Sequence, residues 1–314
     1  MILSASAKPS RRSRFGWVAL GMALALTILG LSSTTARAAT QIQLAQALWS
    51  SPAGWTLNNQ AQLVDDELVL TPASYAQAGS AFNTSRLQLG SDYSFSAAFQ
   101  FRISDSGRGG ADGIVFVLQT ATNTAGSTGG GMGYAGIPNS VGIEFDTWKN
   151  SADPNGNHVG VNLNGSTASA VTADAPVNLE DGQLKYAWVD YNGSTNSLEV
   201  RLANNQTRPG SPLIAHTVDV ESVLGQPLAY TGFTAATGGA YAKHVIGSFY
   251  FDNQYHSDGL DFAESYTQVA APTAHDAAIA APPHPTETQG TLTGEDPADL
   301  PLEFMVAAQP AHGT

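Results

Sequence analysis

Residues 141–163 read VGIEFDTWKNSADPNGNHVGVNL, and this stretch indicates the fold because two alternating apolar segments flank a polar loop. Every second residue of 141–145 is apolar, while Glu144 and Asp146 fall on the opposite face. Residues 159–163 repeat the alternation. A period of two is typical of half-buried β-strands, so the stretch predicts two strands joined by a polar loop.

Similar patterns recur over residues 40–267, which are rich in Val, Thr, Phe, Tyr, Gly and Asn. They predict further strands at 93–103, 113–118, 185–191, 198–202, 228–235 and 245–251. Asn192-Gly193 follows the third of these strands, which predicts a hairpin with the fourth. Many strands joined by Gly- and Asn-rich turns predict an all-β sandwich or jelly roll.

The two ends of the chain differ in composition from the middle. A basic start, an apolar run and Ala36-Arg37-Ala38 predict a signal peptide over residues 1–38. Residues 268–314 are rich in Ala and Pro and then acidic, which predicts a disordered tail. The domain itself is expected at 39–267, in a protein that is secreted, periplasmic or held at the cell surface.

Charge and cysteine usage narrow the function further. Residues 1–38 hold five of the 13 Lys and Arg and none of the 26 Asp and Glu, so their removal leaves a net charge of −18. Such acidity argues against nucleic-acid partners and anionic membranes. There is no second long apolar run to insert into a membrane, and no cysteine to form a disulfide. Stability must come from a large core, with a contribution from bound metal.

Potential metal ligands are concentrated in residues 144–158. Glu144 and Asp146 stand two residues apart on a strand, so both carboxylates leave the same face. His158 begins the next predicted strand, and Asp153 lies in the loop between. Carboxylates with one imidazole suit a borderline ion such as Mn²⁺.

A second set of ligands in the same loop contains only oxygen donors. Asp146, Asp153, the Asn150 side chain and the Trp148 carbonyl would suit Ca²⁺. The plain alternative is a solvated polar loop with no ion, which the number of suitable donors makes the weaker interpretation. A calcium loop of the EF-hand type starting at Asp153 fails, because its sixth residue is His158 instead of Gly.

A glycoside hydrolase is another interpretation of Glu144 and Asp146. Laminarinase-like hydrolases, which also use a jelly roll, carry E-x-D-x-E or E-x-D-x-x-E. The final carboxylate is absent here, because those positions are Trp148 and Lys149. The sequence therefore favours binding over catalysis, and we expect no enzyme activity.

The metal-binding segment resembles that of the legume-type (L-type) lectins, and other motifs follow in the family's order. They are ADG with IVFVLQ at 111–119, TGGG at 128–131, WVDYNG at 188–193, GFTAATGGAYAKH at 232–244, and the opening strands at 62–71 and 80–82. The resemblance covers about residues 42–267. It implies a jelly-roll sandwich of large antiparallel sheets and a shallow carbohydrate site beside Mn²⁺ and Ca²⁺.

The resemblance also assigns residues to these sites. The transition metal would be held by Glu144, Asp146, Asp153 and His158, and calcium by Asp146, Trp148, Asn150 and Asp153. Sugar contacts would come from Asp112, Asn150, Trp148, Gly239, Ala240 and a backbone N–H of Gly130 or Gly131. The family further implies a cis peptide bond before Asp112.

The sequence therefore predicts a secreted, metal-dependent lectin that binds free or conjugated glycans, with mannose or glucose favoured by the short 232–244 loop. A homodimer is compatible with this prediction. The leader and tail are typical of a bacterial member of the family. Two alternatives stay open: a glycoside hydrolase on a related jelly roll, and an adhesive module whose sugar site has decayed.

Overall fold

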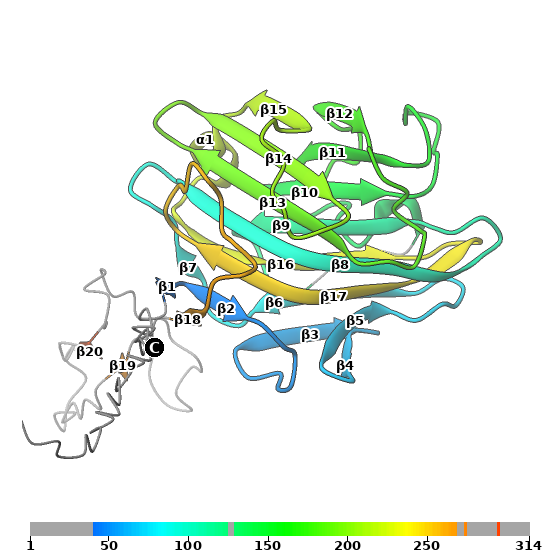
Figure 1. Ribbon diagram of the computed structural model, residues 1–314, viewed down its shortest axis with the longest axis horizontal. Helices are drawn as coiled ribbons and strands as arrows, with labels where there is room; N and C mark the ends of the chain where they lie inside the picture. Colours follow the sequence, from blue (N-terminus) through cyan, green and yellow to red (C-terminus); the bar gives the residue numbers. More distant parts are fainter. Residues whose placement is uncertain (1–39, 125–128, 269–272, 275–293, 296–314) are drawn as a thin grey trace, which may run out of the picture. The chain divides into compact units, whose positions relative to one another are not determined.

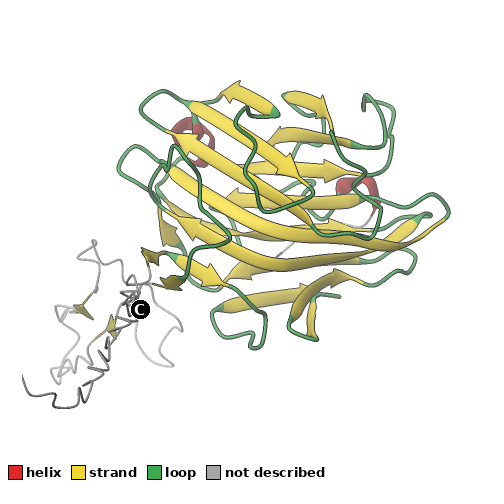
Figure 2. Ribbon diagram, viewed as in Figure 1, coloured by secondary structure: helices red, strands yellow, loops and turns green. Residues whose placement is uncertain are grey.

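The structure is a computed structural model that describes residues 40–124, 129–268, 273–274 and 294–295. The predicted signal peptide and nearly all of the predicted tail lie outside these residues. Within them, no helix has the length and apolar character needed to cross a membrane. Strands and loops make up almost all of the described chain (Figure 2).

One large sheet carries the ends of the strands at which the predicted site lies. It contains β3 (Trp55–Asn59), β6 (Ala78–Asn83), β7 (Leu87–Gln88), β9 (Gly113–Gln119), β10 (Ser140–Asp146), β11 (His158–Leu163), β12 (Val171–Asp174) and β16 (Leu228–Ala236). Their order is β12-β11-β10-β9-β16-β6-β3, with β7 also paired to β16. All of these pairs are antiparallel.

The second large sheet is also antiparallel throughout. It contains β2 (Leu44–Gln46), β4 (Gln62–Val64), β5 (Glu67–Thr71), β8 (Phe95–Gly107), β13 (Lys185–Asn192), β14 (Ser197–Ala203), β15 (Ile214–Thr217) and β17 (Tyr241–Asp252). Their order is β15-β14-β13-β8-β17-β5-β4, with β2 also paired to β17. Figure 1 shows the two sheets as stacked layers, which confirms the predicted all-β jelly-roll sandwich.

The remaining elements are short. They are the parallel pair β1 (Thr40–Ile42) and β18 (Tyr266–Gln268), the antiparallel pair β19 (Thr273–Ala274) and β20 (Gly294–Glu295), the 3-10 helix η1 (Gly129–Gly131) and α1 (Val220–Leu224). The N-cap Asp219 accepts a hydrogen bond from the Ser222 N–H and starts α1, and Gly225 ends it at a φ of 72°. The helix is therefore bounded by its own capping residues.

The main core fills the space between the two sheets and is rich in phenylalanine. The ring of Phe99 on β8 lies 5.4 Å from that of Phe116 on β9 and 5.0 Å from that of Phe233 on β16. These contacts join the sheets, because β8 belongs to one and β9 and β16 to the other. Burial of so much apolar surface supplies the driving force for folding in a chain without disulfides.

Period-two patterning anticipated most of these strands. The apolar residues of β10 join the core, and the adjacent Glu144 and Asp146 face the other way, as predicted. Both carboxylates are nevertheless almost fully buried, with exposures of 1% and 2%. The expected 185–202 hairpin is present, with β13 paired to β14 around a four-residue loop that follows Asn192.

Candidate functional site

Three strand ends of one sheet meet at the candidate site. Gly113 at the start of β9 pairs with Asp146 at the end of β10 and with Ala236 at the end of β16. Asp112 continues this pairing into the loops, because its N–H donates to the Ala236 carbonyl and its carbonyl accepts from the Thr147 N–H. The antiparallel register therefore brings the three loops that follow or precede these strands to one edge of the sheet.

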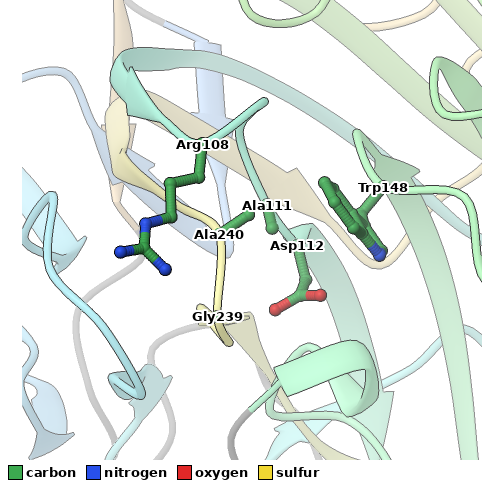
Figure 3. Close-up of a pocket in the computed structure, with 6 residues that line it drawn as sticks. All are labelled: Arg108, Ala111, Asp112, Trp148, Gly239 and Ala240. Carbon is green, nitrogen blue, oxygen red and sulfur yellow. The ribbon is translucent and has the colours of Figure 1, made fainter.

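These loops enclose a shallow depression of about 300 Å³. It is lined by Arg108, Ala111, Asp112, Trp148, Gly239 and Ala240. Figure 3 shows Trp148 on one side of Asp112 and Arg108 on the other, with Gly239 and Ala240 between Arg108 and Asp112. Four of the predicted sugar-site residues, Asp112, Trp148, Gly239 and Ala240, thus lie in one cavity, although they come from three separate parts of the chain.

Asp112 carries the chemistry of this depression. Its side chain is 5% exposed, and its Oδ2 atom is buried without a hydrogen-bond partner. Burial raises its pKa from 3.8 to about 6. The peptide bond between Ala111 and Asp112 is cis, as the family resemblance implied. A carboxylate that lines a depression and has an oxygen without a partner can accept hydrogen bonds from hydroxyl groups of a ligand.

The glycine-rich segment reaches the same place. A Cβ atom at Gly130 would lie 3.1 Å from the Asn150 amide, and one at Gly238 would lie 3.4 Å from Asp112 Oδ2. Gly129 donates its N–H to the Thr237 carbonyl, which ties η1 to the loop after β16. Gly130 and Asn150 therefore adjoin one another, while Gly131 directs its carbonyl to the N–H groups of the following turn. Thr128 lies outside the described residues.

Glu144, Asp146 and His158 form a buried group behind this depression. Asp146 on β10 pairs directly with His158 on β11, and His158 Nε2 lies 3.3 Å from Glu144 Oε1. His158 is fully buried, and its Nε2 has no hydrogen-bond partner, while its Nδ1 contacts the Asn155 carbonyl at 3.0 Å. Antiparallel pairing thus brings the predicted imidazole beside the predicted carboxylates.

The charges in this group alter one another's protonation. Burial raises the pKa of Asp146, although the hydrogen bond from the Trp148 N–H and the charge of His158 oppose the change. Burial lowers the pKa of His158, but the Glu144 carboxylate 3.3 Å from its Nε2 and the nearby Asp146 outweigh it, so the net change is upward. Asp146 and His158 therefore both hold a proton more tightly than the same side chains do in water.

The loop after β10 is organised by its own side chains. Asp146 Oδ1 accepts the Trp148 N–H at 2.7 Å, and Asp153 Oδ2 accepts the Asn150 N–H at 2.6 Å. The Trp148 side chain remains 38% exposed beside the depression. The two aspartates therefore fix the positions of an exposed aromatic ring and an exposed amide.

The predicted ligands do not converge as a complete metal site. In the part of the chain that the structure describes, no group of three or more His, Asp or Glu is arranged to hold an ion. The carboxylates are instead bonded to protein donors: Glu144 accepts from Asn162 and Ser169, and Asp146 and Asp153 accept the backbone N–H groups of their own loop. The structure gathers the donors without orienting them all to one point.

Sequence reasoning missed several residues around the site. Arg108 lines the depression, and its place four residues before Asp112 was the signal that could have found it. Asn162 and Ser169 contact Glu144 from neighbouring segments, and no local sequence pattern predicts such contacts. Glu180, from a distant loop, lies so close under Gly110 that a Cβ there would overlap its carboxylate.

The legume lectin domain family matches residues 49–265. The chain belongs to the legume lectin family. This is a family of carbohydrate-binding domains without catalytic activity, which confirms the predicted non-enzymatic class.

The relatives of this legume lectin chain include plant receptor kinases. The L-type lectin-domain containing receptor kinase IV.1 of Arabidopsis thaliana is 33% identical over 208 residues, which are 57% of this chain and 30% of the kinase. Receptor kinase VIII.1 of the same plant is 29% identical over 202 residues, or 60% and 26% of the two chains. The chain thus spans less than a third of their length. These relatives give no support to a bacterial origin.

Solved structures show the same fold. The basic winged bean lectin with Tn-antigen has a TM-score of 0.58 and 27% identity, covering 66% of this chain and 96% of that one. The Bauhinia forficata lectin in complex with GalNAc has a TM-score of 0.60 and 24% identity, covering 68% and 97%. The second likeness supports the fold alone.

Proposed function

We propose that the protein is a secreted, metal-dependent lectin whose sugar site is the depression around Asp112. The observation that carries the proposal is the buried, unpartnered Asp112 Oδ2 at the meeting point of three loops. Two hydroxyl groups of one sugar ring can donate to this carboxylate. Trp148 offers an exposed ring to the apolar face of the sugar, while Gly239 and Ala240 bring backbone close to it because their side chains are small.

Asn150 would donate its side-chain amide to the same sugar, and Gly130 or Gly131 would contribute a backbone N–H. The proximity of Gly130 to the Asn150 amide supports this grouping. Hydrogen bonds to a charged acceptor contribute about 1.5–3 kcal/mol each. Because the depression is shallow, a few such bonds would account for most of the affinity for a monosaccharide.

Two metal ions are part of the proposal, and the chemistry of the gathered donors supports them although the donors do not all point to one position. A fully buried His158 Nε2 without a partner, beside buried Glu144 and Asp146, is the donor set of a transition-metal ion such as Mn²⁺. Asp153 would complete that set. Calcium would be held by Asp146, Asp153, the Asn150 oxygen and the Trp148 carbonyl. Bound cations would neutralise the carboxylates and fix the loop that carries Trp148 and Asn150.

The sugar preference and location are further parts of the proposal. The short loop between β16 and β17 favours mannose or glucose. The winged bean lectin above binds Tn-antigen, so a galactose-type preference is the alternative that a test must include. Secretion and a bacterial origin rest on the predicted leader and tail and stay predictions. No observation at the site favours the hydrolase, which lacks a second catalytic carboxylate.

A glycan array with metal-loaded and chelator-treated protein tests the proposal. Binding to mannose or glucose glycans that chelator abolishes is expected. Elemental analysis of the loaded protein should find both Ca²⁺ and Mn²⁺, and His158→Gln should lose the transition metal first. Glycan binding that survives complete removal of metal would contradict metal dependence, and absence of any glycan binding would contradict the lectin function.

A further inference from the structure

Arg108 stands at the edge of the depression without an acidic partner. It is exposed, and it forms no ion pair or side-chain hydrogen bond with any described residue. Arg102, Arg201 and Arg208 each lie against a carboxylate. Arg86 and Arg108 are the described arginines without such a partner, and of these two only Arg108 lines the depression.

An aromatic stack holds the Arg108 guanidinium in place. Its central carbon lies 4.9 Å from the centre of the Tyr75 ring, and Tyr75 packs edge-on against Tyr241 with ring centres 4.8 Å apart. Tyr75 therefore covers one face of the guanidinium and leaves the N–H groups along its edge available. Such a contact orients the group without neutralising its charge.

The stack is tied to the wall of the depression by hydrogen bonds on both sides of Tyr75. The Ala76 N–H donates to the Gly238 carbonyl, and the Thr237 hydroxyl donates to the Ser74 carbonyl. Gln77 and Thr237 add a further backbone hydrogen bond. These hydrogen bonds therefore anchor the loop that carries Tyr75 to the segment that leads into Gly239 and Ala240.

The backbone at Arg108 also supports a role for its side chain. Arg108 has a φ of 58°, and Gly109 and Gly110 follow with φ values of 98° and 71°. The left-handed region costs a residue with a side chain about 1 kcal/mol, and glycine avoids that cost. Gly109 passes close to the Trp148 ring, which its Cβ would approach to 3.4 Å. Of the three consecutive residues with a positive φ in this turn, Arg108 is the one with a side chain, and that side chain lines the depression.

We infer that Arg108, held by Tyr75, forms a second subsite that binds the carboxylate or sulfate of an acidic sugar linked to the sugar over Asp112. This inference rests on the lectin function proposed above and names its ligand class. The planar guanidinium edge matches an oxyanion in two hydrogen bonds. Figure 3 shows Arg108 pointing to the same side of the loops as Asp112, with Gly239 and Ala240 between them.

The negative charge of Asp112 determines which sugar of the ligand can carry the acidic group. Asp112 would repel an anion on the ring that it binds, so the oxyanion must lie on the neighbouring sugar. The overall acidity of the chain does not prevent this, because charges beyond about 8 Å are largely screened at physiological salt. Arg108 is the cationic side chain in the lining that the second sugar would meet.

Matched disaccharides test the inference. Metal-loaded protein is titrated with glucosyl-glucose and glucosyl-mannose of several linkages, and with the counterparts whose outer sugar is glucuronic acid or a 6-sulfated glucose. We expect at least one acidic disaccharide to bind about three- to tenfold more tightly than its neutral counterpart, with the preference declining at high salt. Whether the glucuronic acid or the sulfated disaccharides gain affinity identifies the oxyanion as a carboxylate or a sulfate.

Two variants give the control. Arg108→Gln should bring the ratio of acidic to neutral affinity to about one. Arg86→Gln should keep the ratio of the unmodified protein, although it removes the same charge from a similar stack, in which Arg86 lies 5.4 Å from the Tyr230 ring centre. Neutral binding with no acidic preference, or a preference that persists in Arg108→Gln, would overturn the subsite alone. Absence of all disaccharide binding would overturn the mannose or glucose preference and the subsite together, whereas the lectin function itself is tested separately by the glycan array.

Discussion

Replacing Asp112 with asparagine should change how the stability of the protein depends on pH. The carboxyl group has a pKa of about 6 in the folded protein against an ordinary value of 3.8, because it is buried. A tenfold difference in proton affinity corresponds to about 1.4 kcal/mol, so the gap amounts to at most about 3 kcal/mol. Asp112→Asn removes this contribution without changing the shape of the side chain.

The direction of the effect follows from the higher pKa of the folded state. Between pH 3.8 and about 6, folded Asp112 holds its proton more tightly than the unfolded chain does. Its stabilising contribution is complete below this range and is lost as the pH rises through it. Relative to the unmodified protein, Asp112→Asn should therefore gain up to about 3 kcal/mol in free energy of unfolding between pH 4 and pH 6.5.

Urea unfolding followed by tryptophan fluorescence, with chelator present, measures this difference at each pH. Comparing the pH dependence of the two proteins removes any constant cost of the asparagine itself. Asp105→Asn, at an exposed aspartate on β8, is the matched control and should follow the unmodified protein. Parallel curves for Asp112→Asn and the unmodified protein would refute the argument that burial controls this carboxyl group.

Three further outcomes are expected. Trp148→Ala should weaken sugar binding about tenfold in calorimetry with little change in melting temperature, because the ring is exposed; an unchanged affinity would remove it from the site. Glu144→Gln should lower the Mn²⁺ content of the loaded protein, and full retention of the metal would exclude Glu144 as a ligand. Arg208→Ala should lower the free energy of unfolding by about 3 kcal/mol, because it removes the 2.6 Å ion pair with the buried Asp190. Chemical denaturation measures the loss, and a value below about 1 kcal/mol would contradict the prediction.

The strands were the most predictable part of the molecule. In β10 and β11, alternation of apolar residues follows directly from the geometry of an extended chain, and the structure places those residues in the core. The order of the strands in the sheet was less predictable. β9 lies between β10 and β16, and β16 comes more than 100 residues later in the chain, so no local pattern specifies the pairing.

The candidate site also has a part that the sequence predicted and a part that it did not. The grouping of Asp112, Trp148, Gly239 and Ala240 was available from the motifs of the resembling family, and the structure brings them into one depression. Arg108 was not found, because its position depends on a left-handed turn and on a stack with Tyr75 from another loop. The orientation of Glu144, one of the carboxylates proposed to bind metal, was not predicted either, since Ser169 and Asn162 approach it from other segments.

Calorimetric titration of the Ca²⁺- and Mn²⁺-loaded protein with mannose, glucose and galactose, alongside Asp112→Ala, tests the central claim most directly. The unmodified protein should bind mannose or glucose more tightly than galactose and lose that binding on addition of chelator. Asp112→Ala should show no measurable binding while its far-ultraviolet circular dichroism and melting profile show that it remains folded. Equal sugar binding by Asp112→Ala and the unmodified protein would contradict the claim that Asp112 forms the sugar site.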